Sequence, residues 1–144
     1  MADPAFEVEI RSVGGDATGL GNAGPYTLVV DRPDGAGGRG LGFNGGQLLY
    51  LAVAGCVSND LRREAQAAGI RLTSVRVVVG GDFSGDPPVS DEIVYRVEIE
   101  GDGPAEELER LVRHVDKIAE IPNSLRAGTA VTLAGTRIGP SRSR

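Results

Sequence analysis

The chain has 144 residues, of which 40% are hydrophobic and 4% aromatic, so it is long enough for one domain with an aliphatic core. Its formal net charge of -5 argues against a nucleic-acid partner, because affinity for a phosphate backbone rests on clustered Lys and Arg side chains. Its single cysteine excludes an internal disulfide and favours a reducing compartment. The amino-terminal MADPAFEVEI lacks the pattern of a signal peptide, and the longest apolar run, residues 48–57, is far below the roughly 20 residues that a membrane span needs, so we expect a cytoplasmic protein with no membrane partner.

Two antiparallel strands are predicted near the amino terminus. Residues 6–13 alternate between apolar and polar side chains, and residues 26–31 are rich in β-forming residues after the turn residues of 19–25. Residues 32–46 hold seven glycines and are predicted to form a loop.

A long central helix is predicted from about residue 45 to residue 68, with Asn44 as its N-cap and Gly69 at its end. Its residues 48–57 are apolar on every side, and a helix that is apolar all round must be surrounded by other structure. One sheet covers one face, and the other predicted helix offers a single apolar stripe. We therefore expect part of the cover to come from a second copy of the chain in an intimate homodimer, the commonest kind of oligomer.

The second half of the chain predicts a hairpin, a helix and a last strand. Residues 71–83 and 92–101 both alternate in polarity and are separated by a turn with two prolines. Residues 104–120 begin with proline and acidic side chains and carry apolar residues at helical spacing, as in an amphipathic helix. A turn then leads into residues 129–138, which are predicted to form the final strand.

The predicted order of elements is β-β-α-β-β-α-β, without repeats or a break in composition. Hairpins before and between the helices favour an α+β fold with antiparallel sheets over alternating βαβ units. We expect one domain over residues 1–144, ordered from about residue 5 to residue 138, with residues 140–144 as a solvated tail.

Cys56 lies where the apolar half of the central helix gives way to polar residues. Nothing within one turn would activate its thiol, since Ala52 and Val53 precede it and Asp60 follows it. An activating cation must come from elsewhere, with Arg63 or an arginine of the glycine loop as candidates. A role in packing is the alternative, because free cysteines are among the most buried residues.

Three segments carry a resemblance to a known family: GFNGGQLLYLAVAGCVSNDLRREAQAAGI after the glycine loop, VRVVVGGDF in the hairpin, and IPNSLRAGTAV near the end. Together they resemble the osmotically inducible protein C and organic hydroperoxide resistance (OsmC/Ohr) family over roughly residues 25–135. The resemblance implies an intertwined homodimer with two central helices packed between antiparallel sheets. It also implies reduction of organic hydroperoxides by two cysteines, an arginine and a glutamate.

Only part of the site that the resemblance implies is present in this chain. Cys56 matches the cysteine that attacks the peroxide, and Arg39 is the nearest candidate for the arginine. The second cysteine falls at Ala119 or at Ile121, depending on the alignment, and the glutamate falls at Gly46. A disulfide within the chain is therefore missing from the implied reaction.

Two functions from different classes remain open. The first is a one-cysteine reductase of organic hydroperoxides, in which an external thiol or the second copy's cysteine rescues the sulfenic acid formed on Cys56. The second is a dimer without catalysis that binds a small apolar ligand in the same fold.

Other motifs predict neither a cofactor nor a metal. Residues 40–45 fit G-x-G-x-x-G, but they do not directly follow a strand and no βαβ unit surrounds them. His114 is the sole histidine and lacks partners at ligand spacing, and the acidic residues near the hairpin turn lack the spacing of a calcium loop.

Overall fold

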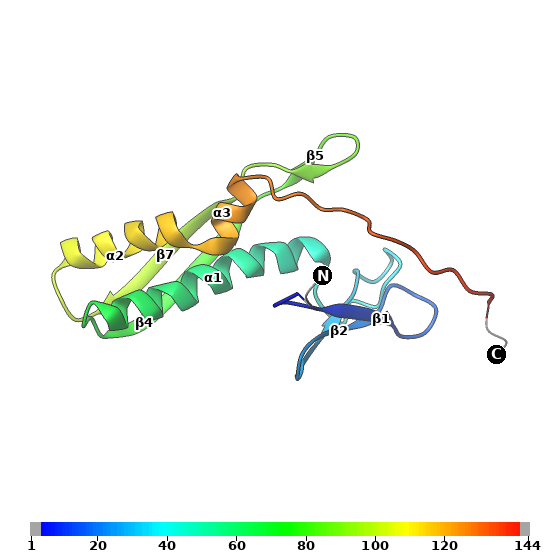
Figure 1. Cartoon of the computed structure of the whole chain (residues 1–144), viewed down its shortest axis with the longest axis horizontal. Helices are drawn as coiled ribbons and strands as arrows, with labels where there is room; N and C mark the ends of the chain where they lie inside the picture. The colour runs from blue at the N-terminus through cyan, green and yellow to red at the C-terminus, as the bar shows by residue number, and fades with distance from the viewer. Residues whose placement is uncertain (1–3, 142–144) are drawn as a thin grey trace.

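The computed structural model describes residues 4–141 and has an α+β architecture, which confirms the predicted fold class. Figure 1 shows two parts of the chain, a body of helices on a long hairpin and a small sheet at the beginning of the central helix. The elements in chain order are β1 (Glu9–Ser12), β2 (Gly19–Ala23), β3 (Tyr26–Val30), α1 (Gly45–Ala67), β4 (Leu72–Gly80), β5 (Phe83–Ser84), β6 (Val89–Ser90), β7 (Val94–Gly101), α2 (Ala105–Ile118) and α3 (Glu120–Arg126).

The central helix α1 has almost the bounds predicted from the sequence. The Asn44 side chain accepts a hydrogen bond from the Gln47 amide, and the Gln47 side chain accepts one from the Asn44 amide, which together form a capping box. Within residues 4–141, no helix combines the length and apolar character that crossing a bilayer requires.

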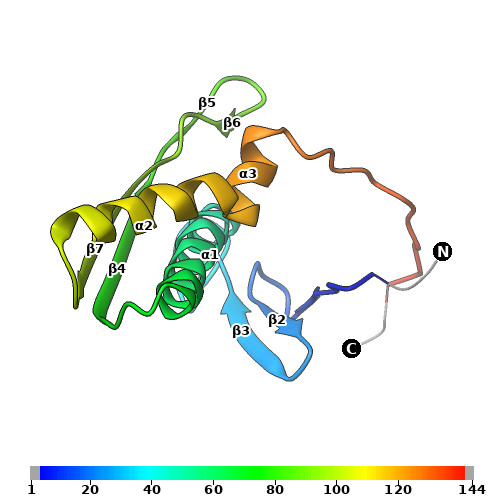
Figure 2. The same ribbon diagram turned by 60° about the vertical axis from the view of Figure 1, so that its left-hand side comes forward.

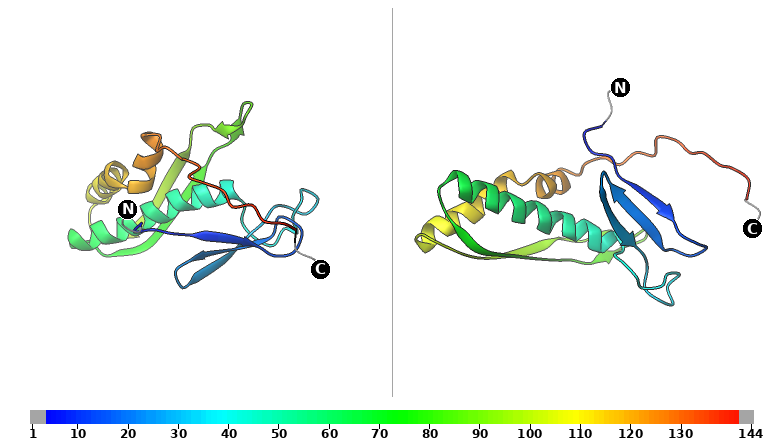
Figure 3. Two further views of the ribbon diagram at one scale, coloured as in Figure 1. Left: turned by 45° about the vertical axis from the view of Figure 1, so that its right-hand side comes forward. Right: turned by 90° about the horizontal axis from the view of Figure 1, so that it is seen from below.

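The core lies between the helices and the hairpin of β4 and β7. These two strands pair antiparallel along almost their whole length, and α1 and α2 pack on the same face of the hairpin (Figure 3, right). Buried side chains from α1, α2, β4 and the junction of α2 with α3 form one cluster: Val57, Leu61, Ala65, Leu72, Leu111, Val115 and Ala119. This cluster explains the helical spacing of apolar residues in α2 and the alternation in both strands.

The amino-terminal sheet has three strands, where the sequence predicted two. β2 lies between β1 and β3 and is antiparallel to both, so the glycine-rich segment predicted as a turn is the central strand. A side chain at Gly19 would place its Cβ 2.9 Å from the Ile10 side chain across the sheet. Gly19 is therefore a position where its neighbour leaves no room for a side chain, and the glycines of this strand hide it from a search for alternation.

The last strand, predicted over residues 129–138, is not formed in the single chain. The segment runs from α3 away from the helical body and past the amino-terminal sheet (Figures 1 and 2). Its large apolar side chains are exposed to solvent: Val131 is 99%, Leu133 82% and Ile138 91% exposed. A strand needs backbone hydrogen bonds to a neighbouring strand, and this segment pairs with none among residues 4–141.

The structure also differs from the prediction in the turn before residue 129. The turn predicted before the last strand contains the short helix α3, in which Pro122 is buried. Of the tail predicted over residues 140–144, residues 142–144 lie outside the described residues.

Candidate functional site

Cys56 lies at the border between the buried and the open face of α1. On one side of it Val53 and Asp60 are buried, and on the other side Ala52 and Asn59 are exposed. The thiol is free and partly buried, and it packs against the core cluster. Its position suits both a reactive thiol at the edge of the core and a packing role.

A pocket of about 470 Å³ opens on the same side of α1 as the thiol. Leu49 and Val53 form its α1 wall, and Leu49 precedes Cys56 by two turns, so both side chains leave the helix in nearly the same direction. The rest of the wall comes from β6, β7, the segment between them and α3: Ser90, Asp91, Glu92, Ile93, Tyr95, Pro122, Leu125 and Arg126. The pocket therefore ends one helical turn from the thiol.

The positions of the missing cysteine and glutamate have structural roles of their own. Ala119, at the start of α3, is fully buried in the cluster against which Cys56 packs. A Cβ at Gly46 would lie 3.1 Å from the Phe83 ring, and the Gln47 side chain is held in the capping box. The position of the second cysteine thus belongs to the cluster against which Cys56 packs, but it carries no thiol.

The structure does not bring Arg39 to Cys56 within one chain. The Arg39 guanidinium forms an ion pair of 2.8 Å with Asp16, and it donates a hydrogen bond to the Val13 carbonyl. Hydrogen bonds from Thr18, together with the Arg39 charge, hold the pKa of Asp16 below its usual value. Among residues 4–141 no hydrogen bond or ion pair joins Arg39 to the thiol, so their pairing stays a prediction.

The other candidate cation, Arg63, is committed to carboxylates at the polar end of α1. It lies 2.9 Å from the buried Asp60 and 3.2 Å from Glu64. These pairs hold Arg63 along its own helix, where it neutralises the acid that follows Cys56 by one turn.

The glycine loop before α1 is organised around the buried carboxylate of Asp31. Its oxygens accept hydrogen bonds from the backbone amides of Arg32, Arg39 and Leu41 and from the Thr18 hydroxyl, at 2.8 to 3.2 Å. Burial raises the pKa of Asp31, but these bonds, with the Leu41 amide first, outweigh it and hold the pKa below its usual value. The loop that carries Arg39 therefore depends on an ionised Asp31.

We expect Asp31→Asn to change how the stability of the chain depends on pH. A carboxyl with a lowered pKa in the folded state stabilises above its unfolded pKa of about 3.9, and this contribution is lost as the pH falls below that value. The variant should be less stable than the wild type at pH 7 and should lose less on acidification, which denaturant titrations between pH 7 and pH 2 would measure. Parallel curves for the two proteins would contradict this role of Asp31.

A network that the sequence analysis missed connects β7, α2 and α3. The Tyr95 hydroxyl donates to the Asp116 carboxylate, and Arg126 lies 2.6 Å from the same carboxylate oxygen. Arg126 also donates to the Asp116 carbonyl at 2.8 Å and to the Asn123 side chain at 2.9 Å, while the Asn123 amide group donates to the Lys117 carbonyl. No sequence signal could reveal this network, because its members are 21 and 10 residues apart and follow no periodicity.

The ionisation of this network is fixed over a wide pH range. Burial and the hydrogen bond to Asp116 raise the pKa of Tyr95 to about 12, and the bond from Tyr95 followed by the Arg126 guanidinium lowers the pKa of Asp116. A phenol with a raised pKa stabilises the fold below its unfolded pKa of about 10, and that contribution is lost as the pH rises further. The network is therefore intact at neutral pH.

A second, more apolar groove lies between the amino-terminal sheet and the beginning of α1. It has a volume of about 450 Å³. Its walls include Ile10, Leu28 and Val30 from the sheet and Leu48 and Ala52 from the open face of α1. In the single chain this apolar surface faces solvent.

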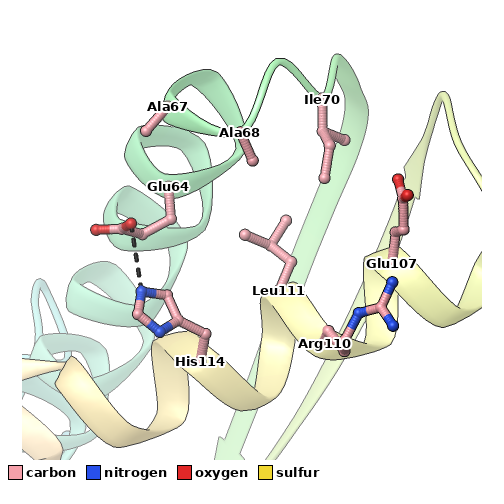
Figure 4. A pocket seen from close by; sticks show the side chains of 8 residues that line it. All are labelled: Glu64, Ala67, Ala68, Ile70, Glu107, Arg110, Leu111 and His114. Carbon is pink, nitrogen blue, oxygen red and sulfur yellow. Dashed lines mark ion pairs between the residues drawn. The ribbon is translucent and has the colours of Figure 1, made fainter.

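A third groove lies at the opposite end of α1, where the helix meets α2 (Figure 4). Ile70 and Leu111 point into it, and His114 lies across it, 3.4 Å from the Glu64 carboxylate. Cys56 does not line this groove. Within residues 4–141, His, Cys, Asp and Glu side chains form no group of three or more that could hold a metal ion.

Comparisons with solved structures place the chain among proteins of one fold. An OsmC-like protein from Mycoplasma pneumoniae superposes with a TM-score of 0.74 at 20% identity, over 87% of this chain and 89% of that one. An organic hydroperoxide resistance protein OsmC from Legionella pneumophila gives a TM-score of 0.63 at 20% identity, over 88% and 92%. The organic hydroperoxide resistance protein OhrB of Bacillus subtilis gives 0.59 at 20% identity, over 85% and 90%.

At these identities the structural likeness shows the fold and leaves the activity to be argued from the site. No curated protein matches the chain significantly in sequence. The model of the family described as OsmC-like protein matches residues 37–134, which include all of α1, the hairpin and both carboxyl-terminal helices. The chain therefore belongs to the OsmC-like protein family.

Proposed function

We propose that this protein is a one-cysteine, thiol-dependent reductase of organic hydroperoxides that acts in defence against oxidative stress. The observation that carries the proposal is the place of Cys56, partly buried on α1 one turn beyond a pocket lined by both apolar and charged side chains. Solved structures named as organic hydroperoxide resistance proteins have the same fold, which supports this class of substrate. The lone cysteine suits a reducing compartment, and we place the reaction in the cytoplasm.

The proposed reaction uses Cys56 in three steps. Its thiolate attacks the terminal oxygen of the hydroperoxide, the O–O bond breaks, and the alkoxide leaves and takes up a proton, which gives an alcohol and a sulfenic acid on Cys56. A small external thiol condenses with the sulfenic acid, forming a mixed disulfide and releasing water. A second thiol then attacks that disulfide, restores the Cys56 thiol and leaves as the external disulfide. No cofactor or metal takes part in these steps.

We propose that the working form is a homodimer in which a second copy covers the open face of α1. On this face Leu51 is 49% exposed, and Ala52 and Gly55 are exposed beside it. The apolar groove at Leu48 and the exposed apolar side chains after α3 add to this surface, and exposed apolar patches mark sites of protein interaction. In this arrangement Arg39 of one copy is the candidate to approach Cys56 of the other.

The stoichiometry of peroxide consumption tests the proposed reaction. Without added thiol, the reduced protein should consume about one equivalent of cumene hydroperoxide per chain and then stop, because the chain has no second cysteine to complete the cycle. With dithiothreitol, consumption should continue. With one equivalent of a monothiol such as 2-mercaptoethanol in its place, mass spectrometry should find a mixed disulfide on Cys56. Failure to consume hydroperoxide under both conditions would overturn the proposal.

We expect Leu51→Glu to dissociate the proposed dimer. The substitution would bury an unpaired carboxylate in the interface, and a cost of roughly 3 kcal/mol corresponds to an association weaker by roughly 100-fold. Sedimentation equilibrium of the wild type and the variant would measure this change. Ala67→Glu is the matched control, because Ala67 is exposed at the polar end of α1. A wild-type protein that is monomeric at all concentrations would contradict the dimer.

A dimer that binds a small apolar ligand without catalysis is the alternative function. The groove of about 450 Å³ beside the amino-terminal sheet favours it, because its walls are almost entirely apolar. Binding of a hydrophobic fluorescent probe that is unchanged by Cys56→Ser, in a protein that consumes no hydroperoxide, would support this alternative.

A further inference from the structure

The proposed reaction requires an external thiol to reach oxidised Cys56, because this chain has no second cysteine. With a second copy on the open face of α1, the pocket that lies on the thiol's side of this helix is the approach that the single chain shows. Pro122, Leu125 and Arg126 of α3 form one wall of the pocket that Leu49 and Val53 form on α1. The contacts that fix α3 in place therefore determine how wide this pocket is.

The short helix α3 packs against α1 and α2 and is also held by polar bonds. At its beginning, Ala119 and Pro122 are buried. At its end, the attachment is polar: Arg126 bonds to the carboxylate and the carbonyl of Asp116, and Tyr95 bonds to the same carboxylate.

The remaining neighbours of this end of the helix leave it open to solvent. Leu125 is 39% exposed, and the described residues after Ala127 are all exposed, with Thr129 bonded back to the Ser124 carbonyl. A seven-residue helix with one buried end and one end held by exposed polar bonds is the kind of segment that opens locally at low cost.

We propose that Tyr95, Asp116 and Arg126 are positioning residues that hold α3 as a cover beside Cys56, and that the width of its opening sets which thiols can reduce the oxidised cysteine. A small thiol enters with α3 in place, and a bulky one enters only when the network releases the end of the helix. The purpose of the cover rests on the proposed function, whereas the cover itself is a property of the fold that can be measured without peroxide.

The test measures how quickly Cys56 reacts with two alkylating reagents of different size. Cys56 is the only cysteine, so any label reports this position alone. Asp116→Ala removes the shared carboxylate while keeping a good helix former in α2. We expect it to raise the rate with a maleimide on a long polyethylene glycol chain by on the order of tenfold, and to change the rate with iodoacetamide by less than about threefold.

Tyr95→Phe provides a second, gentler variant. It removes only the hydroxyl that bonds to Asp116 and keeps the ring, so it should shift the bulky-reagent rate in the same direction by a smaller factor. Asp102→Ala is the matched control, because it breaks a bidentate pair with Arg71 at the opposite end of the hairpin. This control should leave both rates unchanged.

The possible results distinguish local opening of α3 from a general loss of stability, and they test the cover separately from the proposed peroxide reaction. Global unfolding would speed both reagents equally and lower the melting temperature, and that result would overturn the cover. Wild-type rates with the bulky reagent in both Asp116→Ala and Tyr95→Phe would also overturn it. If Cys56 proves inert to hydroperoxide while the labelling rates shift as expected, the proposed function fails and the cover stands.

Discussion

Replacing Cys56 by serine should abolish the turnover of organic hydroperoxides in the presence of dithiothreitol. The side chains are nearly the same size, but the hydroxyl is not ionised near neutral pH and is a far weaker nucleophile than a thiolate. Loss of a nucleophile typically costs on the order of 10³-fold or more in rate, so the residual rate should equal that of buffer with dithiothreitol. Assaying hydroperoxide loss and, by mass spectrometry, oxidation of the chain gives two independent measurements.

Two further variants make this result specific to the thiol. Ser58→Ala removes a hydroxyl from the same helix and should keep the wild-type rate. Arg39→Gln should slow the peroxide step without preventing it, provided that Arg39 of the second copy assists Cys56 in the proposed dimer. Equal rates of hydroperoxide turnover for Cys56→Ser and the wild type would contradict the proposed reaction, and the ligand-binding function would remain.

The largest change in stability is expected for Leu61→Ala. Leu61 is fully buried on α1 in the cluster that joins the helices to the hairpin. Truncation of a buried leucine removes apolar contacts and leaves a cavity, at a cost of about 2 to 5 kcal/mol. Since domains of this kind are stable by only about 5 to 15 kcal/mol, the variant should unfold at a clearly lower urea concentration.

The same substitution at an exposed leucine serves as the control for this prediction. Leu41, in the glycine loop, is 60% exposed, and Leu41→Ala should change stability by no more than about 0.5 kcal/mol. Leu61→Ala should retain peroxide turnover at temperatures where it is folded, because Leu61 does not line the pocket beside Cys56. A shift in midpoint no larger than that of the control would contradict the place of Leu61 in the core.

The sequence by itself determined the elements whose signals are local. Period-two alternation gave β4 and β7, apolar residues at helical spacing gave α2, and Asn44 with Gly69 gave the ends of α1. Each of these signals depends on residues within a few positions of one another, so it can be found without knowledge of the fold. The resemblance to the family likewise rested on α1 and the segments around it, and the family match confirms it.

Local signals failed where a segment depends on what lies across from it. β2 begins with Gly19, where Ile10 on β1 leaves no room for a side chain, and its glycines give no alternation in the sequence. Residues 129–138 were predicted to be the last strand, yet in the single chain they pair with no other strand of the described residues. A strand-like pattern indicates that a segment can join a sheet, but it does not indicate which strand the segment pairs with.

The surroundings of Cys56 were decided by the tertiary structure alone. The sequence placed the thiol at a border within α1, and only packing shows that Ala119, 63 positions later, is buried in the cluster against which it packs. The same holds for the carboxylate of Asp116, which Tyr95 and Arg126 reach from two other elements. Side chains from separate elements meet only when the hydrophobic core fixes those elements against one another, and no spacing along the chain records that meeting.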